Sequence, residues 1–175
     1  AAARTDGLSG LSSGFDALDK MTSGWQNSDL VIIAARPAMG KTAFVLSMAR
    51  NIAITNRVPV AMFSLEMSNV QLVNRLIVNV CEIPGEKIKS GQLAPYEWGQ
   101  LDYKIREMFD APLYVDDTPS LSVFELRTKA RRLVRDYGVK IIIIDYLQLM
   151  NASGMSFGSR QEEVSTISRS LKGLA

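Results

Sequence analysis

The stretch that decides the fold is Ala35-Arg36-Pro37-Ala38-Met39-Gly40-Lys41-Thr42. It follows an aliphatic run and opens a segment with helical spacing, from Lys41 to about Asn56. A strand, a glycine turn and a helix in this order form a phosphate-binding loop, because backbone N–H groups and the helix N-terminus converge on the β- and γ-phosphates of a nucleotide. Lys41 adds a mobile positive charge, and Thr42 adds a hydroxyl for magnesium. The alternative is a strand–turn–helix that contains Gly-Lys-Thr by chance, and both flanks argue against it.

Short aliphatic runs alternate with stretches of helical spacing along the rest of the chain. This alternation is typical of βα units and predicts an α/β fold with a mainly parallel sheet and helices on both faces. The predicted strands are Leu30–Ala35, Val58–Leu65, Leu113–Asp116 and Lys140–Asp145. Their nearly continuous apolar composition fits strands that helices cover on both sides.

Further helices are predicted from capping signals and apolar stripes. Ser68 with Gln71, and Ser122 with Glu125, are spaced as capping boxes. The expected buried stripes are Val70, Val73, Ile77 and Val80; Val123, Leu126, Ala130, Leu133 and Tyr137; Trp98, Leu101, Ile105 and Met108 between Pro95 and Phe109; and Val164, Ile167 and Leu171 between Arg160 and Ala175. We also expect Trp25 and Trp98 to pack in the core.

Composition excludes several kinds of chemistry. The chain has 175 residues, of which 47% are hydrophobic and 22% charged, as in one globular domain. With 1 Cys and 0 His it cannot form a disulfide, a Cys/His zinc site or a Ser-His-Asp triad. Proton transfer must therefore rest on Asp, Glu, Lys, Tyr or water, and any metal must be a hard cation with oxygen ligands, which favours magnesium.

Charge and hydropathy limit the partners and the location. The 20 Lys and Arg residues against 18 Asp and Glu leave a net charge of +2, so DNA binding would need a local patch. A basic run on one predicted helix comprises Arg127, Lys129, Arg131, Arg132 and Arg135, and a solvated helix face is favoured over a DNA contact there. No segment has the length of a membrane span, so we expect a cytosolic protein. Residues 1–13 are expected to be a linker or an expression remnant, and residues 14–175 one domain.

Two acidic residues follow predicted strands. Asp145 ends the run Ile141–Ile144, where a carboxylate would hold magnesium through water; the alternative is a turn or cap residue. Glu66 follows the second strand, where it would stand near the γ-phosphate and polarise a water molecule; the alternative is a solvated glutamate at a helix N-terminus. The phosphate-binding loop between the first strand and its helix favours the functional interpretation of Asp145.

From about residue 8 to the end, the sequence resembles the ATPase domain of bacterial DnaB-type replicative DNA helicases. The motifs that carry the resemblance are Gly14–Asp19, Gly24-Trp25, Asp29-Leu30, Ala35–Thr42, Phe63–Ser68, Ile144–Leu149 and Ile167–Lys172. Arg36-Pro37 inside the loop and Asp145-Tyr146-Leu147-Gln148 separate this family from recombinases of the same fold. Ala at the first loop position, as in Ala35, is frequent in the family, although the general motif has glycine there.

The resemblance implies a RecA-like core that assembles as a homohexamer, binds ATP and Mg²⁺ between subunits, and translocates on single-stranded DNA to unwind the duplex at a replication fork. It implies that residues 35–42 bind the nucleotide, that Lys41 and Thr42 contact phosphate and metal, that Asp145 supports the metal, and that Glu66 is the catalytic base. An arginine from the next subunit would complete the site. It further implies a bacterial, nucleoid-associated cytoplasmic protein with a primase and a helicase loader as partners.

The resemblance also indicates parts of the family that have no counterpart in residues 1–175. These are the strand with the sensor glutamine, the arginine finger, the main DNA loops and the amino-terminal helical domain. The absent strand belongs between the phosphate-loop strand and the Asp145 strand, so we expect an incomplete sheet and no unwinding by residues 1–175 alone. The polar stretch Asn151–Ser159 is expected to be a mobile loop facing the central channel, with Arg160 as a DNA contact.

Two other functions stay open from the sequence. One is another RecA-like ATPase, a recombinase or a phage helicase-primase. Duplex unwinding with fixed polarity would indicate a replicative helicase, and strand exchange would indicate the alternative. The other is a nucleotide-dependent assembly switch that does not hydrolyse ATP. The variant Glu66→Gln separates this switch from a motor: a motor would lose ATP hydrolysis while it still binds ATP, whereas a switch has no hydrolysis to lose.

Overall fold

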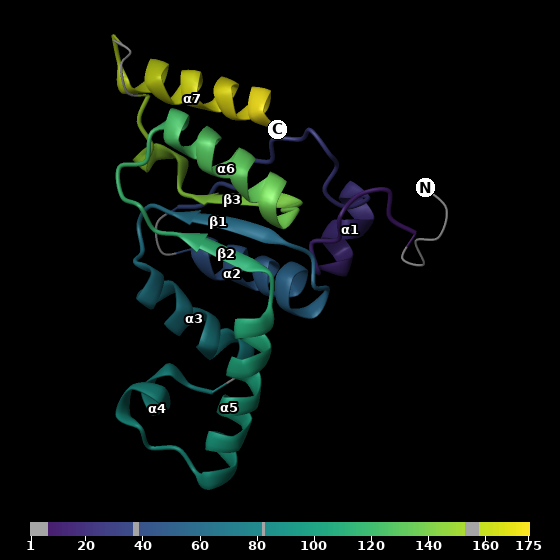
Figure 1. Cartoon of the computed structure of the whole chain (residues 1–175), viewed down its shortest axis with the longest axis vertical. Helices are drawn as coiled ribbons and strands as arrows, with labels where there is room; N and C mark the ends of the chain where they lie inside the picture. Colours follow the sequence, from purple (N-terminus) through teal and green to yellow (C-terminus); the bar gives the residue numbers. More distant parts are fainter. Residues whose placement is uncertain (1–6, 37–38, 82, 153–157) are drawn as a thin grey trace.

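A parallel sheet between two helical layers forms the centre of the molecule (Figure 1). The computed structural model describes residues 7–36, 39–81, 83–152 and 158–175. The elements are α1 (Asp16–Thr22), α2 (Lys41–Ala49), a π-helical segment (Arg50–Thr55), β1 (Val60–Ser64), α3 (Asn69–Cys81), α4 (Gly85–Ser90), α5 (Pro95–Asp110), β2 (Leu113–Asp116), α6 (Val123–Tyr137), β3 (Ile141–Asp145), a 3-10 turn (Leu147–Leu149) and α7 (Arg160–Leu174). No helix in the described ranges combines the length and the apolar character needed to cross a membrane.

The strand order is β2-β1-β3, and both pairings are parallel. In the register, Val60 pairs with Leu113 on one side and with Ile141 on the other. Ser64, the last residue of β1, pairs with Asp145, the last residue of β3. The carboxyl ends of the strands therefore meet at one edge of the sheet, and the loops that follow them share that edge.

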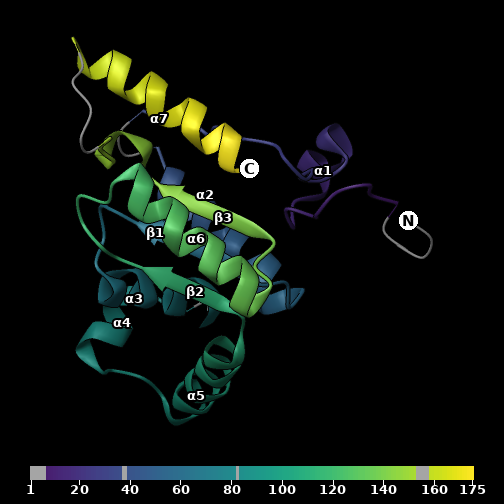
Figure 2. The ribbon, with the colours of Figure 1, turned by 45° about the horizontal axis from the view of Figure 1, so that its top comes forward.

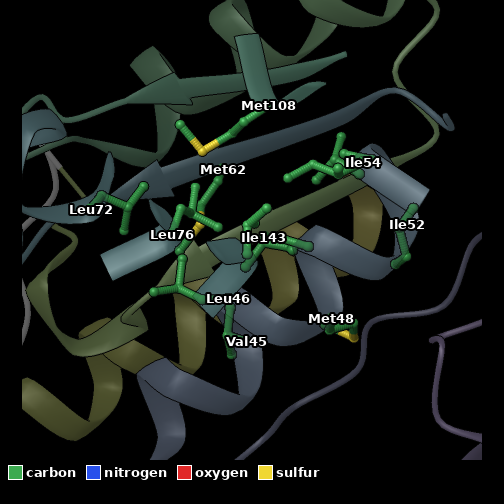
Figure 3. Packing of buried hydrophobic residues seen from close by; sticks show 14 residues of the cluster. Val45, Leu46, Met48, Ile52, Ile54, Met62, Leu72, Leu76, Met108 and Ile143 are labelled. Carbon is green, nitrogen blue, oxygen red and sulfur yellow. The ribbon is translucent and has the colours of Figure 1, made fainter. Parts of the chain in front are cut away.

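Strand β1 is the centre of the core, and its side chains alternate between the two faces. Val60 and Met62 face a cluster formed with α2, the π-helical segment and α3 (Figure 3). Ala61 and Phe63 face the cluster formed with α6 and α7. In Figure 2, α6 lies on one side of the sheet and α2 on the other. Because both faces of β1 are covered, its residues are all buried, as the apolar composition predicts.

The predicted strand at Leu30–Ala35 is not formed, and this prediction is wrong. The segment has no regular secondary structure, and Val31, Ile32 and Ile33 are 46%, 67% and 37% exposed. A parallel strand exists only where a neighbour satisfies its backbone groups. Among the described residues the sheet consists of β2, β1 and β3, and none of these strands pairs with this segment.

The segment before residue 14 belongs partly to the folded unit. Leu11 and Trp25 exchange backbone hydrogen bonds in an antiparallel bridge. Ser13 is buried and its N–H and Oγ donate to Asp19 Oδ1 at 2.8 and 2.7 Å. The Phe15 ring stacks on Phe44 with centroids 5.0 Å apart. Residues that the sequence assigns to a linker therefore anchor the amino-terminal segment to the domain.

Several predicted buried positions are exposed. Val70 of α3 is 70% exposed, whereas Val80 is buried as predicted and Leu72 and Leu76 are buried in addition. Trp98 of α5 is 50% exposed, so its expected place in the core is wrong. Tyr137 of α6 is 53% exposed but stacks on Tyr114 with centroids 4.5 Å apart. The expected helix from Lys41 to about Asn56 is present, as α2 continued by the π-helical segment.

Candidate active site

The predicted phosphate-binding loop leads into α2. Gly40 has a φ of 81°, a left-handed conformation that favours glycine, and its carbonyl accepts the Phe44 N–H at 2.9 Å. Helix α2 begins at the next residue, Lys41. Before it, the Met39 N–H donates to the Arg36 carbonyl at 3.2 Å in a turn. Ala35 and Arg36 are exposed, whereas Pro37 and Ala38 lie outside the described residues.

The carboxylate of Asp145 contacts both Lys41 and Thr42. Its side chain is 2% exposed at the end of β3, and the Lys41 Nζ lies 3.4 Å from its Oδ1. The Thr42 Oγ1 donates to its Oδ2 at 3.1 Å, across 103 residues of sequence. A buried carboxylate needs such partners, because burial of an unpaired charge is strongly unfavourable. The structure thus places Lys41, Thr42 and Asp145 in one cluster at the carboxyl edge of the sheet.

Tyr146 is a member of this cluster that sequence reasoning missed. The Lys41 Nζ lies 4.1 Å from the centroid of its ring, a cation–π distance. The ring and the carboxylate of Asp145 therefore hold the same ammonium. The signal in the sequence was its place directly after Asp145, but adjacency alone does not give the direction of a side chain.

The oxygen atoms of the cluster fit a magnesium ion that is shared with a nucleotide. Mg²⁺ takes one or two protein oxygens and fills its remaining positions with phosphate oxygens and water. The Thr42 hydroxyl and the Asp145 carboxylate provide such oxygens side by side. In the part of the chain that the structure describes, no group of three or more His, Cys, Asp or Glu gathers as a metal site built from protein alone.

Glu66 stands at the same edge of the sheet. It lies in the segment between β1 and α3, and its side chain is exposed. The preceding residue, Leu65, donates its N–H to the Asp145 carbonyl at 2.9 Å, which ties this segment to the end of β3. Within the described ranges its carboxylate has neither an ion pair nor a hydrogen bond, so it is free to act on a water molecule or a ligand.

Arg160 lies at the start of α7 and is held by local partners. Its guanidinium contacts the Gln148 carbonyl, donates to the Met150 carbonyl at 2.8 Å, and forms an ion pair with Glu163 at 2.9 Å. These contacts join α7 to the turn that follows β3. Residues 153–157, most of the predicted loop Asn151–Ser159, lie outside the described residues.

The basic run on α6 divides into two kinds of residue. Arg131, Arg132 and Arg135 are exposed, as expected of a solvated face. Lys129 is half-buried, and its Nζ lies 2.8 Å from Asp116 Oδ2. Burial alone would raise the pKa of Asp116, but hydrogen bonds from Lys129 and Thr118 outweigh it and hold that pKa below its ordinary value.

The sequence also matches a known protein family. The family model described as the DnaB-like helicase C terminal domain matches residues 10–175. The chain belongs to this family. The fold resembles that of solved DnaB-like ATPase domains, and the recognition of the family from its motifs is confirmed.

Relatives in the same family are similar over nearly the whole chain. "Replicative DNA helicase DnaB" of Geobacillus stearothermophilus is 49% identical over 96% of the chain, and "Replicative DNA helicase DnaC" of Bacillus subtilis is 45% identical over 98% of it. The chain spans 37% of the first relative and 38% of the second.

Two solved structures superpose closely on the chain. A DnaB-like replicative helicase, described with its interactions with primase, superposes with a TM-score of 0.89 at 38% identity, covering 99% of this chain and 42% of that one. The ATPase domain of G40P superposes with a TM-score of 0.88 at 39% identity, covering 97% of this chain and 61% of that one.

Proposed function

We propose that this domain is the motor of an ATP-dependent replicative DNA helicase, which works as a homohexamer and hydrolyses ATP between subunits to translocate on single-stranded DNA and unwind the duplex. The observation that carries the proposal is the convergence of Lys41 and Thr42 on Asp145, from segments far apart in the sequence. Membership of the DnaB-like family gives this cluster its context.

Each residue has a role that its position supports. Residues 35–42 would surround the phosphates, with Lys41 leaving Asp145 to meet the negative charge of the nucleotide. Thr42 and Asp145 would hold Mg²⁺, which supplies charge stabilisation at the transferring phosphoryl group. Glu66 would orient and deprotonate the attacking water as general base. An arginine from the next subunit would stabilise the transition state, so turnover depends on assembly.

The partners follow from the same proposal. Single-stranded DNA would pass through the ring, and a primase and a helicase loader would bind the assembled protein in the bacterial cytoplasm at the nucleoid. One solved relative is described with its interactions with primase, which supports that part. A net charge of +2 is compatible with DNA binding, because six subunits in a ring add their phosphate contacts.

ATP hydrolysis by the full-length protein tests the proposal. We expect DNA-stimulated turnover, which is lost in Lys41→Ala and in Glu66→Gln except for a small residual rate. The two variants differ in binding: Glu66→Gln retains ATP, whereas Lys41→Ala loses affinity for it. ATP binding without turnover in the wild-type protein would contradict a motor and favour an assembly switch. Strand exchange without unwinding would indicate a recombinase instead.

We also propose Arg160 as a DNA contact. Its place at the end of the 151–159 segment supports this, although local acceptors hold its guanidinium. Arg160→Ala should weaken single-stranded DNA binding and reduce the slope of log K against log salt by about 0.7. Glu163→Gln, which frees the guanidinium from its carboxylate, is the control and should not weaken binding. A lower melting temperature with an unchanged salt slope would assign Arg160 a structural role only.

A further inference from the structure

The segment that carries Glu66 is tied to the sheet on both sides of that residue. Before it, the Leu65 N–H donates to the Asp145 carbonyl at 2.9 Å. After it, the Ser64 Oγ donates to the Met67 carbonyl at 2.9 Å and accepts the Met67 N–H at 3.3 Å. Ser64 is 1% exposed, so this hydroxyl is enclosed at the end of β1. The backbone at Glu66 is thus fixed to its own strand and to β3.

A further tie comes from the neighbouring strand. Asp117 directly follows β2, and its Oδ2 accepts the Asn69 N–H at 2.8 Å, across 48 residues of sequence. Asn69 is the first residue of α3, where backbone N–H groups have no partner within the helix. A carboxylate at this end also interacts favourably with the helix dipole. Asp117 therefore holds the point at which the Glu66 segment enters α3.

The other groups at this helix start are already used. Ser68 and Gln71 form the predicted capping box: the Ser68 N–H donates to Gln71 Oε1 at 3.1 Å, and the Gln71 N–H donates to Ser68 Oγ at 3.3 Å. Asp116, the neighbour of Asp117, is occupied by Lys129 at 2.8 Å. Asp117 is consequently the one carboxylate of this pair that reaches α3.

We propose that Asp117 is a positioning residue for Glu66. Because the Glu66 carboxylate has no hydrogen bond or ion pair within the described ranges, its direction depends on the backbone that carries it. Asp117 fixes one end of that backbone through Asn69. Misplacement of a catalytic group by about 1 Å can reduce a rate by roughly 10²-fold. The proposal rests on the proposed function, in which Glu66 is the general base.

Steady-state ATP hydrolysis by the full-length protein separates positioning from simple helix capping. Asp117→Ala should lower kcat by about tenfold and change the KM for ATP less than about twofold, because the phosphate-binding loop is untouched. Asp117→Asn keeps an acceptor oxygen and should restore kcat to within about threefold of wild type. Asn69→Pro removes the donor of the same hydrogen bond. Proline is well tolerated at the first helical position, so this variant should fold and reproduce the loss of kcat.

A combination with Glu66→Gln distinguishes this inference from the proposed function. If Asp117 acts through Glu66, the residual turnover of Glu66→Gln, measured under single-turnover conditions at high enzyme concentration, should be the same with and without Asp117→Ala. The proposal is overturned by additive losses, by a raised KM in place of a lowered kcat, or by a lower melting temperature with wild-type kcat. Full turnover in Glu66→Gln alone would reject the proposed function and this inference with it. Loss in Glu66→Gln with wild-type kcat in Asp117→Ala would reject this inference alone.

Discussion

The ammonium of Lys41 lies 4.1 Å from the centroid of the Tyr146 ring and 3.4 Å from Asp145 Oδ1. Both partners belong to the end of β3 and its continuation, so this strand holds the cation of the phosphate-binding loop. A phosphate group that enters the loop must compete with the ring and the carboxylate for the same charge. In the proposed site, the end of β3 would therefore influence nucleotide affinity through Lys41 as well as through metal binding.

Removal of the ring should tighten nucleotide binding. A cation–π contact at a partly exposed site is worth about 0.5–1 kcal/mol, and its loss corresponds to a change in Kd of about two- to fivefold. We expect Tyr146→Leu to lower the Kd for ATP by this factor, because the free state loses a contact that the bound state does not use. Tyr146→Phe retains a ring and should match the wild type. Titration with a fluorescent ATP analogue measures both, and weaker binding by Tyr146→Leu would show that the ring orients Lys41 toward phosphate.

The pair Thr42 and Asp145 should control the dependence on magnesium. Groups that orient a metal and its ligands typically contribute 10- to 100-fold to affinity or activity, so Asp145→Asn should raise the Mg²⁺ concentration for half-maximal turnover by about that range. Thr42→Ser keeps the hydroxyl and serves as the control, whereas Thr42→Val should resemble Asp145→Asn. Turnover is measured at fixed ATP over a series of Mg²⁺ concentrations. An unchanged Mg²⁺ dependence in Asp145→Asn would exclude Asp145 from the metal site.

Sequence reasoning reached the cluster at Lys41, Thr42 and Asp145 because each residue stands at a fixed place in a local pattern. The loop precedes helix α2 and the carboxylate ends β3, and contacts from Lys41 and Thr42 at the start of the helix join the two. Tyr146 and Asp117 could not be found in this way. Their roles depend on side-chain direction and on contacts across 48 residues or more, which local patterns do not encode.

The fold shows the same division between local and non-local causes. The strand Leu113–Asp116 was predicted with its observed bounds, since an apolar run between turn residues is a local signal. The segment Leu30–Ala35 carries an equally strong signal and forms no strand, because strand formation also requires a neighbour to pair with. Helix starts at Ser68 and Ser122 were predicted because their caps are local, and the hydroxyl of each accepts the expected N–H.

Helix α3 offers a test of the buried stripe. The sequence pattern places Val70 in the core, but Val70 is 70% exposed and Leu72 is 0% exposed. We expect Val70→Ser to change the free energy of unfolding by less than about 0.5 kcal/mol. Leu72→Ala should lower it by about 2–5 kcal/mol, through lost burial and a cavity. Urea unfolding of both variants measures the difference, and a large loss for Val70→Ser would place that residue in the core after all.

Asp19 should make the stability of the domain sensitive to acid. Burial alone would raise the pKa of Asp19, but hydrogen bonds from Ser12, Ser13 and the Gly14 N–H outweigh it and hold that pKa below its ordinary value. Because the pKa is lower in the folded state than the value of about 3.9 in the unfolded chain, the stabilisation is present above that value and is lost as the pH falls through the folded pKa.

Substitution of this carboxylate should therefore act at neutral pH and disappear in acid. Asp19→Asn replaces a charged acceptor with a group that cannot accept all of these bonds, so we expect a loss of about 1–3 kcal/mol in the free energy of unfolding at pH 7. The difference from wild type should shrink below about pH 4, because the Asp19 carboxylate is then protonated first in the unfolded chain and, at lower pH, in the folded protein. Asp16, exposed on the same helix, is the matched control, and Asp16→Asn should change stability by less than about 0.5 kcal/mol. Urea unfolding over a pH series measures both variants, and a pH-independent loss in Asp19→Asn would mean that packing at this site, rather than the charge, stabilises the amino-terminal segment.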